Sequence, residues 1–139
     1  MQRFYMDTCI WRDYFEDRKD RFQPLGEFAS RFLFGVQKKG YFLLYSDLIV
    51  EELQKAYSDE KISIIFNPFQ SNLKKVSIAY EQAAESKQLA RTQIESHRQD
   101  ILHAILARDN GALLVTRDNG FASLSNIVQS AKPEEINLD

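Results

Sequence analysis

The sequence predicts an α/β protein, a three-layer α/β/α sandwich on a parallel sheet of about five short strands. Short apolar runs suited to buried strands alternate with longer segments whose apolar residues recur at helical spacing. Polar or acidic residues directly follow several of those runs. With 139 residues, 44% hydrophobic and 27% charged, the chain can bury a proper core, so we expect a single domain over residues 1–139.

The composition limits the function classes. The net charge of −2 lacks the basic signature of a nucleic-acid binder, although a local basic rim can hold phosphates while metal ions neutralise an acidic centre. Cys9 is alone, which argues against a disulfide framework or a thiolate metal cage. The sequence shows no signal peptide and no apolar run long enough to cross a bilayer, so we expect a cytoplasmic protein without a membrane partner.

The N-terminal part predicts one strand and two helices. An apolar run at 3–6 indicates the first strand, and Asp7 or Thr8 can cap the helix that follows. The polar residues 16–23 are expected to form a loop or a ragged helix end. Apolar residues at helical spacing predict a helix at 27–39, whose two final lysines before a glycine are typical of a helix C-terminus.

The middle of the chain repeats the alternation of strand and helix. Residues 41–45 are aromatic and apolar, as in a strand, and the Ser-Asp pair after them offers an N-cap for a helix over 46–57. A short helix is predicted at 59–66, ended by an Asn-Pro pair. Residues 76–78 are a weak third strand, and the Ala-, Gln-, Glu- and Lys-rich segment 81–95 has high helix propensity.

The stretch from Asp100 to Phe121 is the most informative part of the sequence. Its first half has helical periodicity and stops at Asn110-Gly111, because glycine enters the left-handed cap conformation at little cost. Residues 112–116 form an apolar run suited to a strand buried on both faces, and residues 117–120 turn the chain at its carboxyl end. The remaining predictions are a short helix at 121–124, a fifth strand at 126–131 and a polar tail from Lys132.

Four acids lie where a strand ends or a flanking helix begins: Asp7, Glu52, Asp100 and Asp118. In open α/β sheets ligands bind beyond the carboxyl ends of the strands, so these acids can converge there. Charges of the same sign that lie close together are unfavourable, and a divalent cation removes that penalty. Oxygen-only ligands favour Mg²⁺ or Mn²⁺ over Zn²⁺, and such an ion can activate water and stabilise the leaving oxygen of a phosphodiester.

Each of these acids also has a purely structural explanation. Asp7 and Asp118 can cap a helix or make a turn. Glu52 can belong to a solvated helix face, and Asp100 can be an N-cap. His103 lies one turn after Asp100 and can orient it, although a lone histidine is commonly an ordinary surface or core residue. Taken singly, none of these residues identifies a site.

Taken together, these motifs resemble the PIN domain, a family of metal-dependent ribonucleases that includes the VapC-like toxins of toxin–antitoxin pairs. Residues 6–8 resemble its first strand with the leading Asp, and residues 46–53 resemble its second motif. Glu52 fits the family acid because it directly precedes an apolar residue, with Glu51 as the alternative. Residues 100–121 resemble the third and fourth motifs at matching spacing, and the likeness covers nearly the whole chain.

The resemblance implies an endoribonuclease that hydrolyses RNA through a metal-bound water, giving a 5′-phosphate and a 3′-hydroxyl. Many members carry a further acid where this chain has Gly120, so the number of metal ions stays open. The site expected from the resemblance has Mg²⁺, with Mn²⁺ as a possible substitute, held by catalytic acids and supported by polar neighbours. The acids are Asp7, Glu52, Asp100 and Asp118, and the neighbours are Thr8, Thr116 and His103.

The resemblance also implies partners. A small antitoxin in toxin-type relatives inserts a basic side chain among the acids, and homodimers are common. Here the helix at 27–39 could supply apolar contact through Phe28, Phe32 and Phe34, although the first two also suit the core. Four basic residues are candidates for contact with RNA phosphates, each with an ordinary surface charge as the alternative: Arg12, Lys74, Lys75 and Arg117.

Two alternative functions remain. The first is a catalytically weak PIN-like module that binds RNA or protein, which Gly120 supports; metal-dependent cleavage would separate it from a nuclease. The second is a phosphoacceptor receiver domain, because Asp47 follows a strand. That function calls for adjacent acids after the first strand, where this chain has Asp7-Thr8, and it leaves Asp100 and Asp118 without roles.

Overall fold

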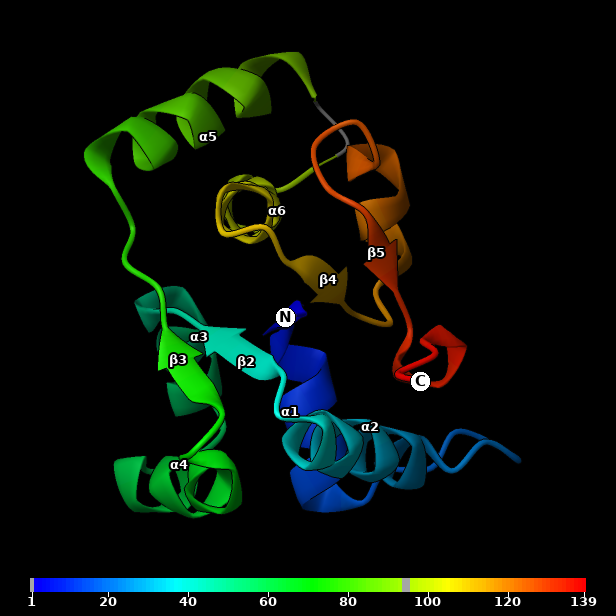
Figure 1. Cartoon of the computed structure of the whole chain (residues 1–139). Helices are drawn as coiled ribbons and strands as arrows, with labels where there is room; N and C mark the ends of the chain where they lie inside the picture. The colour runs from blue at the N-terminus through cyan, green and yellow to red at the C-terminus, as the bar shows by residue number, and fades with distance from the viewer. Residues whose placement is uncertain (1, 94–95) are drawn as a thin grey trace.

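The computed structural model describes residues 2–93 and 96–139, and a five-stranded sheet lies at its centre (Figure 1). The strand order is β3-β2-β1-β4-β5, and every neighbouring pair is parallel. All carboxyl ends therefore meet at one edge of the sheet. The strands are β1 (Arg3–Met6), β2 (Phe42–Tyr45), β3 (Leu73–Lys75), β4 (Leu113–Val115) and β5 (Ser130–Ala131).

Helices cover both faces of this sheet. The α-helices are α1 (Thr8–Glu16), α2 (Leu25–Lys39), α3 (Asp47–Gln54), α4 (Asp59–Phe66), α5 (Tyr80–Thr92) and α6 (Arg98–Asp109). Short 3₁₀ helices are η1 (Asn67–Phe69), η2 (Asn119–Leu124) and η3 (Pro133–Glu135). Figure 1 shows α5 and α6 on one side of the sheet and α1, α2 and α4 on the other, which is the predicted three-layer sandwich.

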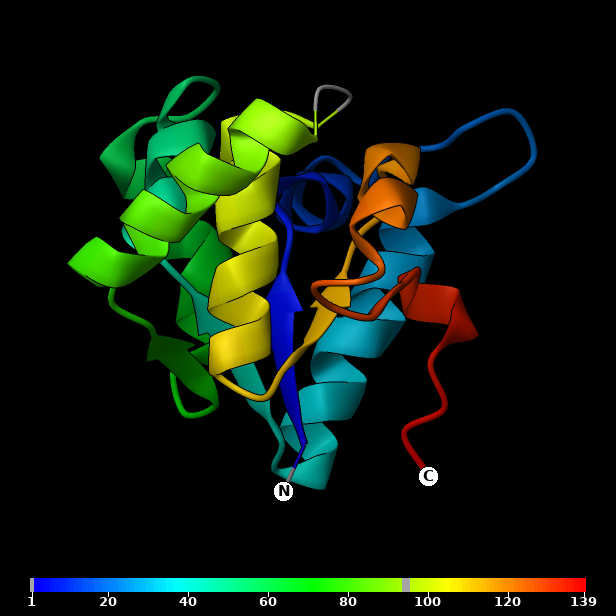
Figure 2. The same cartoon turned by 90° about the horizontal axis from the view of Figure 1, so that it is seen from above.

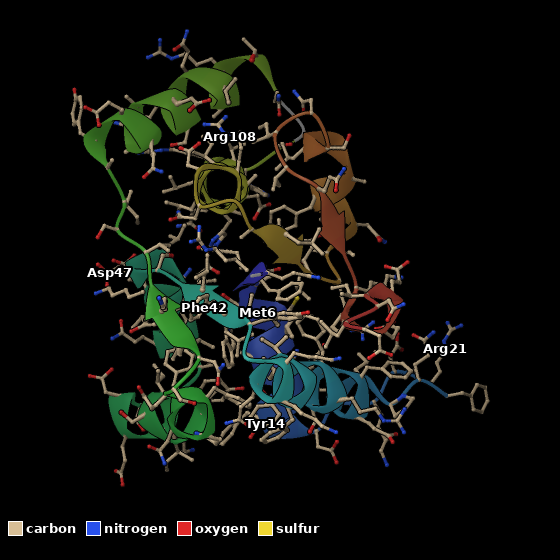
Figure 3. All side chains as sticks on the ribbon, viewed as in Figure 1. Met6, Tyr14, Arg21, Phe42, Asp47 and Arg108 are labelled. Carbon is tan, nitrogen blue, oxygen red and sulfur yellow. The ribbon has the colours of Figure 1, made fainter. Side chains whose placement is uncertain are left out.

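The core lies between these layers. Met6 of the central strand β1 is fully buried between the helical layers, whereas Arg21 lies at the periphery (Figure 3). Trp11 of α1 and Ile105 of α6 are also completely buried, one in each helical layer. Arg108 joins α6 to the outer helix α5 through two hydrogen bonds to Glu85, at 2.8 and 2.9 Å. Among the described residues, none of the helices combines the length and the apolar character that spanning a bilayer requires.

The strand predicted at 76–78 is wrong, because β3 forms earlier in the chain, at Leu73–Lys75. It is an edge strand beside β2, with Leu73 opposite Leu43. An edge strand tolerates charged side chains because one of its sides faces solvent. The exposed Lys74 and Lys75 therefore belong to the strand, although they break the apolar run that a sequence search looks for.

Three other predicted bounds also need correction. The fifth strand was expected at 126–131 but contains only Ser130–Ala131, because the amides of residues 127 and 128 bond back to Leu124 and prolong the turn after η2. The helix expected to reach Tyr57 ends at Gln54. The helix predicted at 81–95 spans Tyr80–Thr92, and residues 94–95 lie outside the described part of the chain.

The corner between α1 and α2 depends on close backbone contact at Gly26. The amide of Gly26 donates to the carbonyl oxygen of Arg18 at 2.9 Å. A Cβ atom at position 26 would lie 2.5 Å from the Cα of Asp17, whereas a Cβ at Gly35 would meet only a side-chain methyl of Leu138, at 2.8 Å. The Cα of Asp17 is backbone and cannot move aside, whereas the methyl group of Leu138 can rotate away.

We therefore predict that Gly26→Ala destabilises the protein by about 2–3 kcal/mol, because the methyl group forces α1 and α2 apart. Gly35→Ala is the matched control, since it places the same methyl group in the same helix. It should stay within about 1 kcal/mol of wild type, with improved helix propensity offsetting the displacement of Leu138. Urea unfolding of the two variants measures the difference. Equal stabilities would contradict this account of the corner.

Candidate metal centre

Asp7 lies at the carboxyl end of β1, where it is the N-cap of α1 and only 8% exposed. Its Oδ1 accepts a hydrogen bond from the amide of Thr8 at 2.8 Å, and its Oδ2 accepts one from the hydroxyl of Thr116 at 2.7 Å. Thr116 is itself buried, directly after β4, and also accepts from the amide of Asp118 at 3.0 Å. The cap expected for Asp7 is thus present, and the same carboxylate connects the ends of two strands.

Glu52 of α3 lies beside Asp7, whereas its neighbour Glu51 is exposed. Its Oε1 accepts from the hydroxyl of Thr8 at 2.6 Å, and its Oε2 is 2.8 Å from Nε2 of His103. Burial alone would raise the pKa of Glu52, but the hydrogen bond and charge of His103 lower it below the ordinary value. The structure thus places Glu52, and not Glu51, at the carboxyl edge of the sheet.

His103 contacts Glu52 and does not orient Asp100 as the sequence suggested. It is 1% exposed, and its Nδ1 lies 2.8 Å from the hydroxyl of Tyr5, which is 2.7 Å from the hydroxyl of Ser46. Tyr5 was not among the residues expected near the site, whereas Ser46 was expected as a helix N-cap and as part of the second motif. A signal was available for Tyr5, because a tyrosine in a buried strand needs a partner for its hydroxyl.

Asp100 lies in the first turn of α6 and is half-buried. The explanation of Asp100 as an N-cap is wrong, because α6 begins at Arg98 and its N-cap position is His97. Burial raises the pKa of Asp100, and the negative charges of Asp118 and Asp7 raise it further. The charges of Asp7 and Asp118 therefore both act on Asp100, as expected if the three acids share one site.

Asp118 is the N-cap of η2 and accepts a hydrogen bond from the amide of Gly120 at 2.8 Å, so its expected role in a turn is observed. A Cβ at position 120 would lie 3.1 Å from Oδ1 of Asp118. Any larger residue at this position would crowd the carboxylate of that turn. Figure 2 shows that the end of β1, the first turn of α6 and η2 all lie at the same edge of the sheet.

Asp7, Glu52 and His103 form the closest group of potential metal ligands among the described residues. One ligand atom from each lies within 4.8 Å of the others. Asp100 and Asp118 lie outside this tight group, and the charges of Asp118 and Asp7 both raise the pKa of Asp100. Oδ1 of Asp7 and both carboxylate oxygens of Glu52 have one protein hydrogen bond each, whereas Oδ2 of Asp7 also accepts from the thiol of Cys9 at 3.3 Å. An oxygen with one such bond keeps a lone pair for an ion, so the group can hold a divalent cation.

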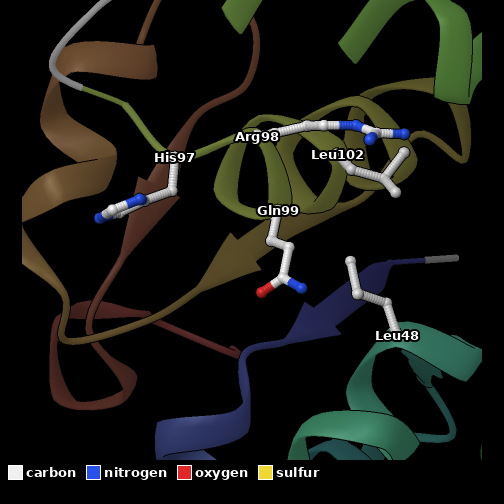
Figure 4. A pocket seen from close by; sticks show the side chains of 5 residues that line it. All are labelled: Leu48, His97, Arg98, Gln99 and Leu102. Atoms are coloured by element: carbon white, nitrogen blue, oxygen red, sulfur yellow. The ribbon is translucent and has the colours of Figure 1, made fainter. Parts of the chain in front are cut away.

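A hollow of about 510 Å³ lies between α3 and the start of α6 (Figure 4). Its lining combines apolar side chains from both helices with one cationic residue: Leu48, His97, Arg98, Gln99 and Leu102. Leu102 directly precedes His103 in α6, but none of the lining residues belongs to the group of Asp7, Glu52 and His103. Arg98 places a positive charge at its wall.

The four basic residues proposed to contact phosphate all have neighbours within the fold. Arg117 is 13% exposed and pairs with Glu134 at 2.6 Å and with the buried Asp13 at 3.3 Å. It therefore ties η3 to the end of β4 and to α1. The other three have weaker contacts: Arg12 pairs with Glu16, Lys75 with Asp47, and Lys74 lies over the ring of Phe42.

No model of a known protein family and no curated protein sequence matches the chain. Among solved structures, VapBC2 from Rickettsia felis, bound to a DNA fragment from its promoter, is 18% identical with a TM-score of 0.68, over 94% of this chain and 98% of that chain. FitAcB from Neisseria gonorrhoeae is 18% identical with a TM-score of 0.60, over 96% of this chain and 99% of that chain. FitAB bound to an IR36 DNA fragment is 19% identical with a TM-score of 0.61, over 96% of this chain and 97% of that chain. At these identities the likeness shows the fold, a PIN-like parallel sheet of five strands flanked by helices.

We predict that the Arg117–Glu134 bond stabilises the protein only above acidic pH. Burial alone would raise the pKa of Glu134, but the hydrogen bonds from Arg117 lower it below the ordinary value. The contribution is therefore present above the unfolded pKa of about 4.3 and is lost as the pH falls through the lower folded pKa.

Glu134→Gln should therefore cost up to about 1 kcal/mol at pH 7. This cost should disappear at the acidic end of a series of urea unfolding curves measured at decreasing pH. Glu27→Gln is the matched control, because Glu27 pairs with Arg31 at the exposed surface, where the pair should contribute almost nothing to stability. A cost at Glu134 that does not change with pH would contradict this assignment.

Proposed function

We propose that the protein is a metal-dependent endoribonuclease and the toxin of a toxin–antitoxin pair. The observation that carries the proposal is the group of Asp7, Glu52 and His103 at the carboxyl edge of a PIN-like sheet. Asp100 and Asp118 complete the site on the side of α6 and η2. The catalytic and metal-binding residues proposed here are Asp7, Glu52, Asp100 and Asp118, with Thr8 and Thr116 in support.

The residues have separable tasks in this proposal. Asp7 and Glu52 would hold a divalent cation, Mg²⁺ or Mn²⁺, which when bound supplies Lewis-acid stabilisation of the charge that develops on a phosphodiester. Thr116 fixes the orientation of Asp7 by its hydrogen bond. The pKa of Asp100 is raised by burial and by the charges of Asp118 and Asp7, so a nearby cation would stabilise its ionised form, and we assign it to the ion as well.

The partners follow from the same surface. The likeness to VapBC2 and FitAB structures supports a small antitoxin as the protein partner. A basic side chain from such a partner would relieve the repulsion among the acids, as a cation does. RNA would reach the acids from the same edge of the sheet, beside the hollow that carries Arg98. With Arg117 engaged in ion pairs, contact with phosphates would depend on Arg12, Lys74 and Lys75.

The homodimer expected from the resemblance remains part of the proposal. Phe32 is buried and Phe28 is half-buried, so both contribute to the fold, as the alternative explanation required. Phe34 is 41% exposed and packs against Phe69 and Tyr14. Of the three aromatic residues, only Phe34 leaves substantial apolar surface for a second copy of the chain.

The binding-module alternative is supported by a specific observation, because Asp118 is engaged in its own turn and Gly120 adds no further acid. The receiver-domain alternative is not supported. A receiver domain has the strand order 2-1-3-4-5, whereas the sheet of this protein has the order β3-β2-β1-β4-β5. Asp47, its candidate phosphoacceptor, pairs with Lys75.

We predict that purified protein cleaves RNA with Mg²⁺ or Mn²⁺ but not with a chelator. Asp100→Asn should lower the rate on the order of 100-fold or more, because it removes an acid from the site. Asp109→Asn is the matched control: Asp109 is in the same helix but pairs with Arg108 at the surface, so the rate should not change. A panel of structured and unstructured RNAs provides the substrates.

The outcomes separate the two candidate functions. Equal cleavage by wild type and Asp100→Asn would show that the activity comes from a contaminant. Folded, partner-free wild type that cuts none of the RNAs with either metal would favour the binding module.

A further inference from the structure

We propose that Ser46, Tyr5 and His103 form a positioning chain for Glu52, in which His103 is a hydrogen-bond donor and not a metal ligand. The inference rests on the proposed function, because it concerns how Glu52 is held for a cation. It goes beyond that function, because it assigns tasks to Tyr5 and Ser46, which the nuclease proposal does not use, and makes His103 a hydrogen-bond donor instead of a potential ligand.

The chain of contacts runs through the protein interior. It starts at the hydroxyl of Ser46 in the N-cap of α3, crosses β1 through the hydroxyl of Tyr5, and reaches Nδ1 of His103 on α6. From Nε2 of the same ring it returns to α3 at Oε2 of Glu52. Ser46 and Tyr5 are completely buried and His103 is 1% exposed. Three buried polar groups thus lead to one carboxylate.

The direction of the hydrogen bonds follows from Glu52. An ionised carboxylate can only accept, so Nε2 of His103 must carry a hydrogen. In a neutral ring Nδ1 is then an acceptor, Tyr5 donates to it, and Ser46 donates to Tyr5. In a charged ring Nδ1 donates to Tyr5, which donates to Ser46. Both arrangements leave the same N–H on Glu52, so the task of His103 does not depend on its charge.

The order of exposure indicates that His103 lies behind Glu52. The side chain of Glu52 is 19% exposed, whereas that of His103 is 1% exposed. An ion that arrives from solvent with its substrate therefore meets the carboxylate first. Direct coordination by Nε2 would also remove the hydrogen that Glu52 accepts. The closeness of His103 to the two acids is then explained by its bond to Glu52.

Glu52 gains a fixed orientation from this arrangement. Thr8 donates to Oε1 and His103 to Oε2, so the carboxylate cannot rotate freely although it stands next to Asp7. Partners of this kind hold metal-binding carboxylates in place, and their loss typically weakens metal binding by about 10–100-fold.

The experiment measures Mn²⁺ affinity of the full chain by electron paramagnetic resonance, with Mg²⁺ added as a competitor. Tyr5→Phe removes only the hydroxyl between Ser46 and His103, and should weaken Mn²⁺ binding about 10-fold. His103→Leu removes the donor itself and should weaken it further. Tyr57→Phe is the matched control, because its hydroxyl donates to Glu16 outside the site and its loss should leave the affinity unchanged. Thermal unfolding verifies that each variant is folded.

A double-mutant cycle with Glu52→Gln separates positioning from a general loss of structure. If Tyr5 acts through Glu52, Tyr5→Phe should have little further effect on Mn²⁺ affinity in the Glu52→Gln background. An equal effect in both backgrounds would overturn the proposal, as would a Tyr5→Phe protein that binds Mn²⁺ like wild type.

Electron spin echo measurements on the Mn²⁺ complex test the second half of the proposal. We expect no directly coordinated nitrogen in the wild type. A coordinated ¹⁴N signal that disappears in His103→Leu would make the histidine a ligand and overturn the positioning role. Wild-type protein that binds no Mn²⁺ at all would instead remove the metal centre on which the proposed function depends.

Discussion

The carboxylate of Asp7 lies at the end of the central strand, and only 8% of the residue is exposed to solvent. A buried charge of this kind is tolerated only when it is hydrogen-bonded or paired. Here the amide of Thr8 and the hydroxyl of Thr116 supply the bonds, and the start of α1 adds a favourable dipole. The side chain of Asp7 therefore caps a helix, joins the ends of two strands and forms part of the acidic group.

The two sides of the acidic site differ in how their charge is balanced. Glu52 accepts hydrogen bonds from Thr8 and His103, and its pKa lies below the ordinary value although burial opposes this. Asp100 shows the opposite shift, because burial is reinforced by the charges of Asp118 and Asp7. The fold therefore stabilises one acid itself, whereas the other would be stabilised by a cation or by a basic side chain of a partner.

Positive charge near the site is used mainly to hold the fold together. Arg117 follows Thr116 in sequence and could have faced a phosphate, yet it connects η3 to α1 through Glu134 and Asp13. This arrangement balances the charge of Asp13, which is otherwise unfavourable at 3% exposure. A basic residue next to a proposed catalytic motif in sequence is thus weak evidence for substrate contact.

The sequence by itself determined the layered α/β fold, most of the elements and the positions of the acids after the strands. These features depend on local patterns, since apolar runs, helical spacing and capping residues act within a few positions of the chain. It failed at β3, where the edge of a sheet admits Lys74 and Lys75 into a strand.

Only the tertiary structure decided which groups meet. Tyr5 and His103 are 98 positions apart, and His103 and Glu52 are 51 apart. No local pattern relates such residues, because their contact depends on how β1, α3 and α6 pack around the same edge. That packing settled which acid faces inward, Glu52, and which residue His103 contacts. The pairing of Arg117 was settled by the positions of α1 and η3 beside the end of β4.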